Sequence, residues 1–233
     1  MPEPLTIAVA QPLSAAHDVA ANAAEHARAV RSAVARVVVF PELSLTGYEL
    51  DAATVEPGDA RLAPLVAACA ETGAVALAGA PVAGDRGPHI AMLAVDGAGV
   101  TVVYRKMWLG EEEALRFAPG SAPGVLEVDG WRLGLAVCKD TGVPEHAAAT
   151  TALGVDAYVA GTVKHAAEAE LQAGRARRIA AEHGLWVAVA SFAGPTGGGF
   201  ADTAGRSGFW APGGGLVAQA GPETGATLTT KLS

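Results

Sequence analysis

Residues 131–160 read WRLGLAVCKDTGVPEHAAATTALGVDAYVA, and this stretch decides the fold class. Its spacing predicts an apolar strand over 131–137, a helix near 145–153 and a second strand over 157–160. Two further elements continue the same alternation, a helix over 166–183 and a strand over 185–191. Strands that alternate with helices predict sheets covered by helices on one side.

The amino-terminal part of the chain shows both kinds of pattern. Apolar residues at helical spacing predict helices over 18–34, with Asp18 as its cap, and over 59–72, where Gly73 ends the helix. Short apolar runs predict strands at 5–10, 36–40, 74–80, 90–95 and 100–105. Near the end of the chain, a hairpin is expected around the turn Pro212-Gly213-Gly214, with strands at 206–211 and 215–219.

Domain organisation follows from the absence of repeats and linkers in the sequence. The Gly/Pro-rich segments 119–124 and 194–199 are short, so we interpret them as loops rather than as domain boundaries. A chain of 233 residues is long enough for a sizeable core. We therefore expect one domain over residues 1–233.

Composition and charge exclude several classes of protein. Hydrophobic residues make up 51% of the chain and charged residues 17%, which is unlike a disordered protein. The net charge of −8 argues against binding to nucleic acid or to anionic membranes. No Lys or Arg precedes Arg28, and no stretch has the roughly 20 apolar residues of a spanning helix, so we expect a cytoplasmic protein.

Three chemically reactive groups stand at the ends of predicted strands. Cys138 follows the strand over 131–137 and precedes a helix, where backbone N–H groups can lower a thiol pKa and hold an oxyanion. Glu42 follows the strand over 36–40, beside Phe40 and Leu43, and suits a general base of raised pKa. Lys106 ends the strand over 100–105 and needs a carboxylate partner if it is buried.

Each of these groups also has a structural interpretation. A buried cysteine is commonly core filler, which is the better interpretation of Cys69 on the apolar face of a helix. A single glutamate such as Glu42 is commonly a solvated loop residue. A base, a cation and a thiol at three strand ends are stronger evidence for catalysis together than alone.

The order of these motifs resembles the nitrilase superfamily of carbon–nitrogen hydrolases. The resemblance rests on Phe40-Pro41-Glu42 followed by Thr46-Gly47-Tyr48, on Tyr104-Arg105-Lys106, and on Cys138 with Asp140 and Pro144-Glu145 downstream. It covers nearly the whole chain and also includes Gln11-Pro12, Asn22, Pro119-Gly120, Arg206-Ser207-Gly208 and Pro212-Gly213. The resemblance implies a four-layer αββα sandwich, that is, an α/β fold with a Glu–Lys–Cys triad.

By the same resemblance, Cys138 is the nucleophile, Glu42 the general base, and Lys106 with the backbone N–H of Lys139 stabilises the oxyanion. Glu113 stands six residues before Pro119, as a further glutamate does in many members, although Glu111 and Glu112 are close enough to leave that choice open. The candidate oxyanion and substrate-binding residues are Lys139, Tyr48, Trp108, Thr162 and Lys164.

The sequence departs from the family pattern around the substrate pocket. Lys139 replaces a common Tyr or Asn, Trp108 replaces a common His, and an Arg often found shortly after the Asp is missing from Thr141-Gly142-Val143. The chain is also shorter than most members, with a reduced C-terminal tail. The triad is intact, but no particular substrate follows from the resemblance.

The expected function is thiol-dependent hydrolysis of a small amide or N-carbamoyl compound. Nitrile hydrolysis by the same triad and a non-catalytic binding module on the same fold are the alternatives. The chemistry needs no cofactor, and the histidines lack paired carboxylates at metal-ligand spacing, so we expect no metal. The expected partners are a small-molecule substrate and further copies of the chain, as a homodimer or higher oligomer.

The four lysines suggest a possible substrate charge. Three of them, Lys106, Lys139 and Lys164, stand near one rim of the predicted sheet, and the fourth is Lys231. A cationic pocket at this rim favours an anionic substrate. The equal alternative is that Lys139 points away and pairs with a carboxylate such as Glu145.

Overall fold

The computed structural model describes residues 3–233 and contains two mixed six-stranded sheets. The first sheet has the order β12-β1-β2-β3-β4-β5. In it β1 is parallel to β2 and β2 to β3, whereas the other neighbours are antiparallel. Its strands are β1 (Leu5–Ala10), β2 (Val37–Val39), β3 (Val75–Val82), β4 (His89–Asp96), β5 (Gly99–Arg105) and β12 (Thr227–Leu232).

The second sheet has the order β11-β10-β9-β8-β7-β6. Its central strands β7, β8 and β9 are parallel, and the strands at both sides of them are antiparallel. The strands are β6 (Gly124–Val128), β7 (Trp131–Val137), β8 (Ala157–Thr162), β9 (Trp186–Ser191), β10 (Gly208–Trp210) and β11 (Leu216–Gln219).

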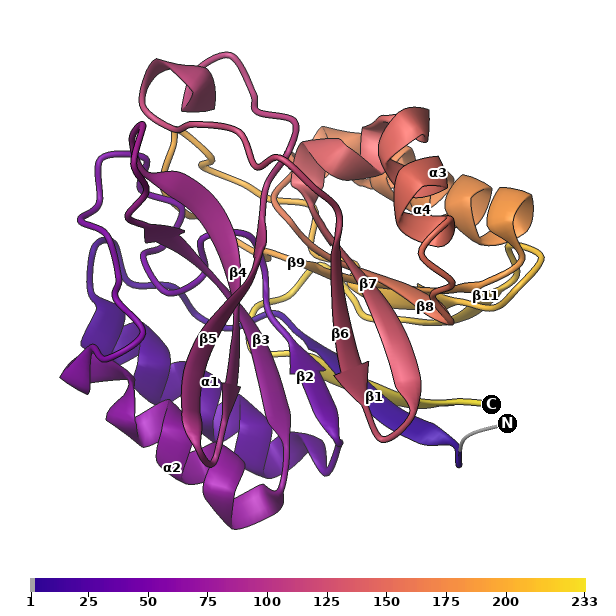
Figure 1. Cartoon of the computed structure of the whole chain (residues 1–233), viewed down its shortest axis with the longest axis horizontal. Helices are drawn as coiled ribbons and strands as arrows, with labels where there is room; N and C mark the ends of the chain where they lie inside the picture. Colours follow the sequence, from indigo (N-terminus) through magenta and orange to yellow (C-terminus); the bar gives the residue numbers. More distant parts are fainter. Residues whose placement is uncertain (1–2) are drawn as a thin grey trace.

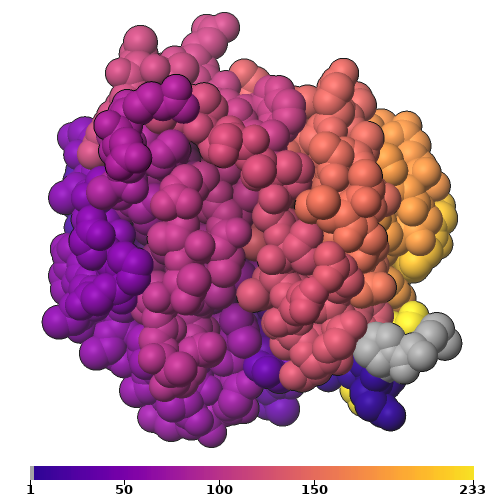
Figure 2. Space-filling view, viewed as in Figure 1, coloured from indigo at the N-terminus to yellow at the C-terminus, as the bar shows by residue number. Residues whose placement is uncertain are grey.

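Within residues 3–233, four α-helices cover the outer faces of the two sheets (Figure 1). The helices are α1 (Val19–Ala33), α2 (Ala63–Thr72), α3 (Pro144–Thr151) and α4 (Ala169–His183). Helices α1 and α2 lie against the first sheet and α3 and α4 against the second, which confirms the expected αββα sandwich. Figure 2 shows the two halves of the chain, indigo to magenta and rose to yellow, side by side.

Alternation along each strand builds three separate apolar layers. Ile7 and Val9 of β1 point into the core between the sheets, whereas Ala8 points toward α1 and α2. On β7, Leu135 points into the same central core and Ala136 points toward α3 and α4. Because successive side chains of a strand point to opposite faces, a strand buried on both faces is apolar throughout.

Most predicted elements are confirmed, with shifts of one or two residues at their ends. Helix α1 begins after Asp18, whose side chain accepts a hydrogen bond from the N–H of Ala21 at 2.9 Å. The helices expected over 59–72 and 166–183 each start with a short 3₁₀ turn, Ala60–Leu62 (η1) and Ala166–Glu168 (η4). Two strands were not predicted from the sequence, β6 beside a Gly/Pro-rich loop and the Thr-rich β12, because both are only partly buried.

Two glycines let the two sheets approach each other at the segment after β2. A Cβ atom on Gly79 of β3 would lie 2.2 Å from the backbone N of Leu43, and one on Gly161 of β8 would lie 2.6 Å from the carbonyl O of Phe40. Strands from both sheets therefore contact the same turn through backbone atoms. This close approach fixes the position of Glu42 between the sheets. Within residues 3–233, no helix is both long and apolar enough to cross a membrane.

We expect Gly79→Ala to lower the free energy of unfolding by about 1–3 kcal/mol, because the added methyl group overlaps backbone that cannot move freely. The matched control is Gly174→Ala on α4, where an added Cβ meets no atom within 4 Å. This control should be neutral or slightly stabilising, since Ala favours helix more than Gly does. Urea unfolding of both variants measures the effect, and equal midpoints would contradict the packing argument.

Candidate active site

The ammonium group of Lys106 lies between two buried carboxylates. Lys106 directly follows β5, and its Nζ donates hydrogen bonds to Glu42 Oε1 at 2.6 Å and to both oxygens of Glu113 at 2.7 Å. The side chains of Lys106, Glu42 and Glu113 are 1%, 0% and 5% exposed. Burial alone would lower the pKa of Lys106, but the negative charges of Glu42 and Glu113 raise it above its usual range.

Glu113 is the glutamate that enters this cluster. It begins the short 3₁₀ helix η2 (Glu113–Leu115), and its Oε2 also accepts the N–H of Gly110 at 2.6 Å. Burial raises the Glu113 pKa, but Lys106 and these hydrogen bonds outweigh burial and lower it below the usual value. Glu111 and Glu112 are exposed, as solvated neighbours would be.

Glu42 keeps one carboxylate oxygen free in the buried cluster. Oε1 accepts the bond from Lys106, whereas Oε2 is buried and has no hydrogen-bond partner among residues 3–233. Burial raises the pKa of Glu42 to about 8, and the positive charge of Lys106 limits this shift. A carboxylate with a free oxygen and a pKa near neutrality has the properties of a general base.

Cys138 comes from the opposite sheet and has an uncommon backbone conformation. It directly follows β7 and begins the 3₁₀ helix η3 (Cys138–Gly142) with φ 42°, a left-handed value that costs a non-glycine residue about 1–3 kcal/mol. Its Sγ donates a hydrogen bond to the carbonyl O of Val163 at 3.2 Å. The turn therefore directs the thiol into the space between the sheets.

The pKa of the Cys138 thiol differs from the lowered value that the sequence suggested. Burial and, to a smaller extent, the Glu42 carboxylate raise it to about 12, even though the charges of Lys106 and Lys164 oppose this shift. Proximity to a helix start lowers a thiol pKa only where the thiol is not desolvated next to a carboxylate. The resting thiol therefore carries its proton, and a base is needed to remove it.

The other candidate residues have different surroundings. Tyr48 is buried and its hydroxyl donates to Glu113 Oε1 at 2.9 Å, so it contacts the charged cluster directly. Trp108 is half-buried and packs edge-on against His146. Thr162 is buried, and its hydroxyl oxygen lies 2.9 Å from Gln172 Oε1 and 3.2 Å from Ala190 O, so its one proton has an acceptor within the protein.

Each lysine around the site has a hydrogen-bond acceptor or a carboxylate near its ammonium group. Lys139 is exposed, and its Nζ donates to the carbonyl O of Leu109 at 2.5 Å rather than to Glu145. Lys164 Nζ lies 3.5 Å from Glu168 Oε1. Lys106 thus has two carboxylate partners and Lys164 has one, whereas the partner of Lys139 is a neutral carbonyl.

Phe200 borders the site and gave no signal in the sequence. Its ring stacks on His165 with centroids 4.2 Å apart and meets the Tyr48 ring edge-on at 5.3 Å. The loop that carries it is attached to the turn after β2, since Thr196 Oγ1 donates to Gly47 O at 2.9 Å. The Gly-rich composition of 194–199 indicated a loop, but only the fold brings that loop to Tyr48.

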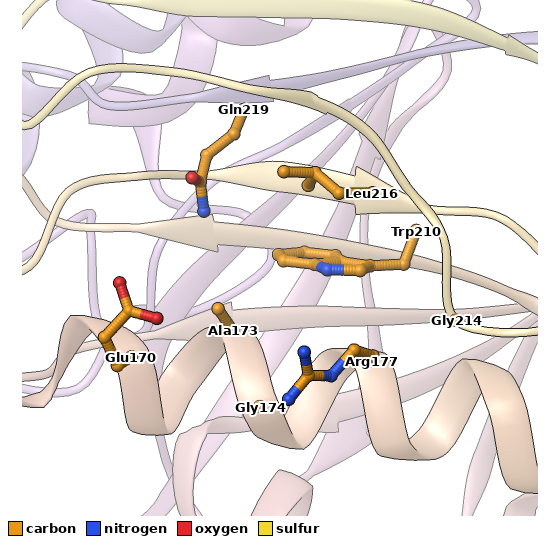
Figure 3. Close-up of a pocket in the computed structure, with 8 residues that line it drawn as sticks. All are labelled: Glu170, Ala173, Gly174, Arg177, Trp210, Gly214, Leu216 and Gln219. Atoms are coloured by element: carbon orange, nitrogen blue, oxygen red, sulfur yellow. The ribbon is translucent and has the colours of Figure 1, made fainter.

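Two other features lie outside this cluster. His17, Glu49 and Asp51 bring three possible metal-ligand atoms within 4.8 Å of one another, although the sequence had not suggested carboxylates beside a histidine. His17 and Asp51 are exposed and are hydrogen-bonded to each other at 2.6 Å, so this group assigns no metal site. A cavity of about 400 Å³ lies between α4 and the β10–β11 hairpin, with Arg177 and Trp210 among its lining residues (Figure 3).

The fold is the four-layer αββα sandwich of the nitrilase superfamily, as in a similar solved structure at 26% identity. The family model for carbon–nitrogen hydrolases matches residues 6–233, and the chain belongs to this family. It is therefore an enzyme that acts on carbon–nitrogen bonds. A search of curated proteins found no significant match.

Solved structures of an amidase from Nesterenkonia sp. AN1 are similar to this chain. A variant of that amidase has 26% sequence identity and a TM-score of 0.88, covering 98% of this chain and 90% of the amidase. A second variant, with a glutamate and a cysteine replaced, contains acrylamide, with 26% identity, a TM-score of 0.89 and coverage of 99% and 91%. A branch 10 member of the nitrilase superfamily from Saccharomyces cerevisiae shares the fold at 19% identity, with a TM-score of 0.87 and coverage of 99% and 90%.

We expect Lys106→Met to lower the free energy of unfolding by about 3–5 kcal/mol, because it leaves two buried carboxylates without a cation. The control is Lys231→Met on the exposed side of β12. Surface charges contribute little to stability, so this control should change the free energy by less than about 0.5 kcal/mol. Chemical denaturation distinguishes the two, and a similar small change for both would contradict the buried cluster.

Proposed function

We propose that this carbon–nitrogen hydrolase hydrolyses a small amide or N-carbamoyl compound through an acyl-enzyme on Cys138. The observation that supports this most is the free Oε2 of Glu42 beside a buried lysine and a buried thiol. The cluster contains a base, a cation and a nucleophile within one water-poor space. These three groups are what acyl transfer through a thiol requires.

In the first half-reaction, Glu42 takes the proton of the Cys138 thiol and the sulfur attacks the carbonyl carbon. The carbonyl π electrons move to oxygen, where Lys106 Nζ and the backbone N–H of Lys139 stabilise the negative charge. The Lys139 N–H stands in the first turn of η3, where helical N–H groups lack intrahelical acceptors. When the carbon–nitrogen bond breaks, Glu42 returns its proton to the leaving nitrogen, and ammonia or an amine departs.

In the second half-reaction, a water molecule attacks the thioester carbon while Glu42 removes its proton. The carbon–sulfur bond then breaks, the thiolate takes the proton from Glu42, and the carboxylic acid leaves. Glu42 therefore acts as base and acid in turn, which a pKa of about 8 suits.

Glu113 and Tyr48 complete the site by holding the lysine. Glu113 keeps a negative charge next to Lys106 at every stage, because its pKa is lowered while that of Glu42 is raised. The Tyr48 hydroxyl orients Glu113. The two carboxylates thus have separate roles, set by their surroundings.

Short amides are bound in solved structures of one similar amidase. The Nesterenkonia amidase structures include complexes with acrylamide and butyramide, at 26% identity to this chain. Phe200 and Tyr48 border the site with apolar rings, which suits a short aliphatic acyl group. The anionic substrate suggested by the lysines and the homo-oligomeric state remain predictions.

The nucleophile can be identified by ammonia release over a panel of amides, N-carbamoyl compounds and nitriles. Cys138→Ala should remove all release, because no other thiol stands at the cluster. Cys69→Ala is the matched control, since that buried thiol lies on α2 in the core under the first sheet, and this variant should keep most activity. An inactive Cys69→Ala with an active Cys138→Ala would refute the proposal, and release from nitriles alone would favour the alternative chemistry.

The pH dependence of kcat/KM should report the base. Because Glu42 must be ionised to take the thiol proton and its pKa is about 8, kcat/KM should rise with pH and level off above that value. Well below the pKa, the expected fall is about tenfold per pH unit. Steady-state kinetics between pH 5.5 and about 9.5 test this, and a profile that is flat across the range would show that Glu42 is not the base.

A further inference from the structure

Four buried polar groups form one hydrogen-bonded chain beneath the nucleophile turn. Tyr158 of β8 contacts His146 Nδ1 at 2.8 Å, His146 Nε2 contacts the Tyr104 hydroxyl at 2.9 Å, and this hydroxyl donates to Asp140 Oδ2 at 2.8 Å. Tyr158, His146 and Asp140 are fully buried, and Tyr104 is 3% exposed. They come from four different elements, β8, α3, β5 and η3.

The available protons allow only one donor-to-acceptor direction along this series of hydrogen bonds. A carboxylate only accepts, so the one proton of the Tyr104 hydroxyl goes to Asp140. The Tyr104 oxygen then accepts from His146, whose Nε2 must carry a proton. Burial lowers the pKa of His146, so the ring is neutral and its Nδ1 accepts the proton of Tyr158.

Asp140, at the end of this chain, holds two backbone segments of the active site. Its Oδ2 also accepts the N–H of Val137 at 2.9 Å, directly before Cys138. Its Oδ1 accepts the N–H of Trp108 at 3.0 Å, two residues after Lys106. One carboxylate therefore connects the turn that carries Cys138 and Lys139 to the segment that carries Lys106.

We propose that Asp140, oriented by Tyr104, His146 and Tyr158, is a positioning residue that sets the backbone N–H of Lys139 relative to the Lys106 ammonium. This inference rests on the proposed function, in which these two groups stabilise the oxyanion. Asp140 makes no hydrogen bond to the Cys138 sulfur among residues 3–233. It acts through the backbone that it holds.

Two reactions of the Cys138 thiol can distinguish misplaced oxyanion donors from a general disturbance of the active site. Amide hydrolysis builds negative charge on the carbonyl oxygen and needs both oxyanion donors. Alkylation by iodoacetamide forms a carbon–sulfur bond as the carbon–iodine bond breaks, iodide leaves, and Glu42 takes the thiol proton. This displacement at saturated carbon creates no oxyanion, so it needs the thiol and the base but not the Lys139 N–H.

The test compares both reactions in variants that each delete one hydroxyl of the chain. Tyr104→Phe should lower kcat for butyramide, or for the best amide of the panel, by about tenfold or more, with KM and the alkylation rate within about threefold. Tyr158→Phe should act in the same direction with a smaller loss. These variants keep the ring volume, which makes them safer for folding than Asp140→Asn.

Thr150→Val is the matched control on the same helix as His146. The Thr150 hydroxyl is buried and has no hydrogen-bond partner among residues 3–233, so its removal should leave both rates unchanged. Loss of turnover and alkylation in equal proportion in Tyr104→Phe, or no loss of turnover, would overturn the inference. A wild-type protein that hydrolyses no amide would refute the proposed function instead.

The histidine tautomer provides a second test that does not depend on turnover. Long-range ¹H–¹⁵N spectra of protein labelled at histidine nitrogen should show His146 neutral with its proton on Nε2, assigned by the signal lost in His146→Gln. Tyr158→Phe should shift the Nδ1 signal, because His146 Nδ1 then loses the Tyr158 hydroxyl as its hydrogen-bond donor. A proton on Nδ1 in the wild-type protein would reverse the chain and overturn the inference.

Discussion

The structure around the site depends on one lysine ammonium that is buried between two carboxylates. Removing such charges from water costs several kcal/mol for each ion, so Lys106, Glu42 and Glu113 are stable in the core only as a group. Within this group, the two glutamates have different hydrogen-bond partners and therefore different pKa shifts. Glu113 has two hydrogen bonds from Lys106 and further donors, whereas Glu42 has one and keeps a free oxygen. Structural stabilisation and basicity thus arise from the same ion cluster.

The two sheets of the sandwich both contribute residues to the site, from the ends of their strands. Glu42 and Lys106 follow strands of the first sheet, and Cys138 follows a strand of the second, so no single sheet contains the site. Gly79 and Gly161 allow both sheets to contact the turn that carries Glu42. Side chains at these two positions would overlap the backbone of this turn. Because the backbones approach so closely, only glycine fits at these two positions. The neighbouring residues in the sequence give no sign of this requirement.

Two buried networks support the two sides of the site by the same physical means. The turn after β2 is held by Ser44, whose hydroxyl lies 2.8 Å from Nε2 of the buried His26. The turn after β7 is held by Asp140 and the chain through His146. In both places a buried neutral histidine connects a helix to an active-site turn. Satisfied polar networks in a core fix one arrangement, because every alternative leaves a buried group without a partner.

The sequence by itself determined the alternation of strands and helices, the reactive groups at three strand ends, and the family pattern that links them. These features are local or ordered along the chain, so apolar periodicity and motif spacing are enough to find them. Only the tertiary structure decided the protonation states and the neighbours. Glu42 and Lys106 are 64 residues apart, and the thiol of Cys138 has a raised pKa because of burial and a carboxylate from the other sheet. Burial and contacts between distant residues set these properties, and neither is encoded in any short stretch of the chain.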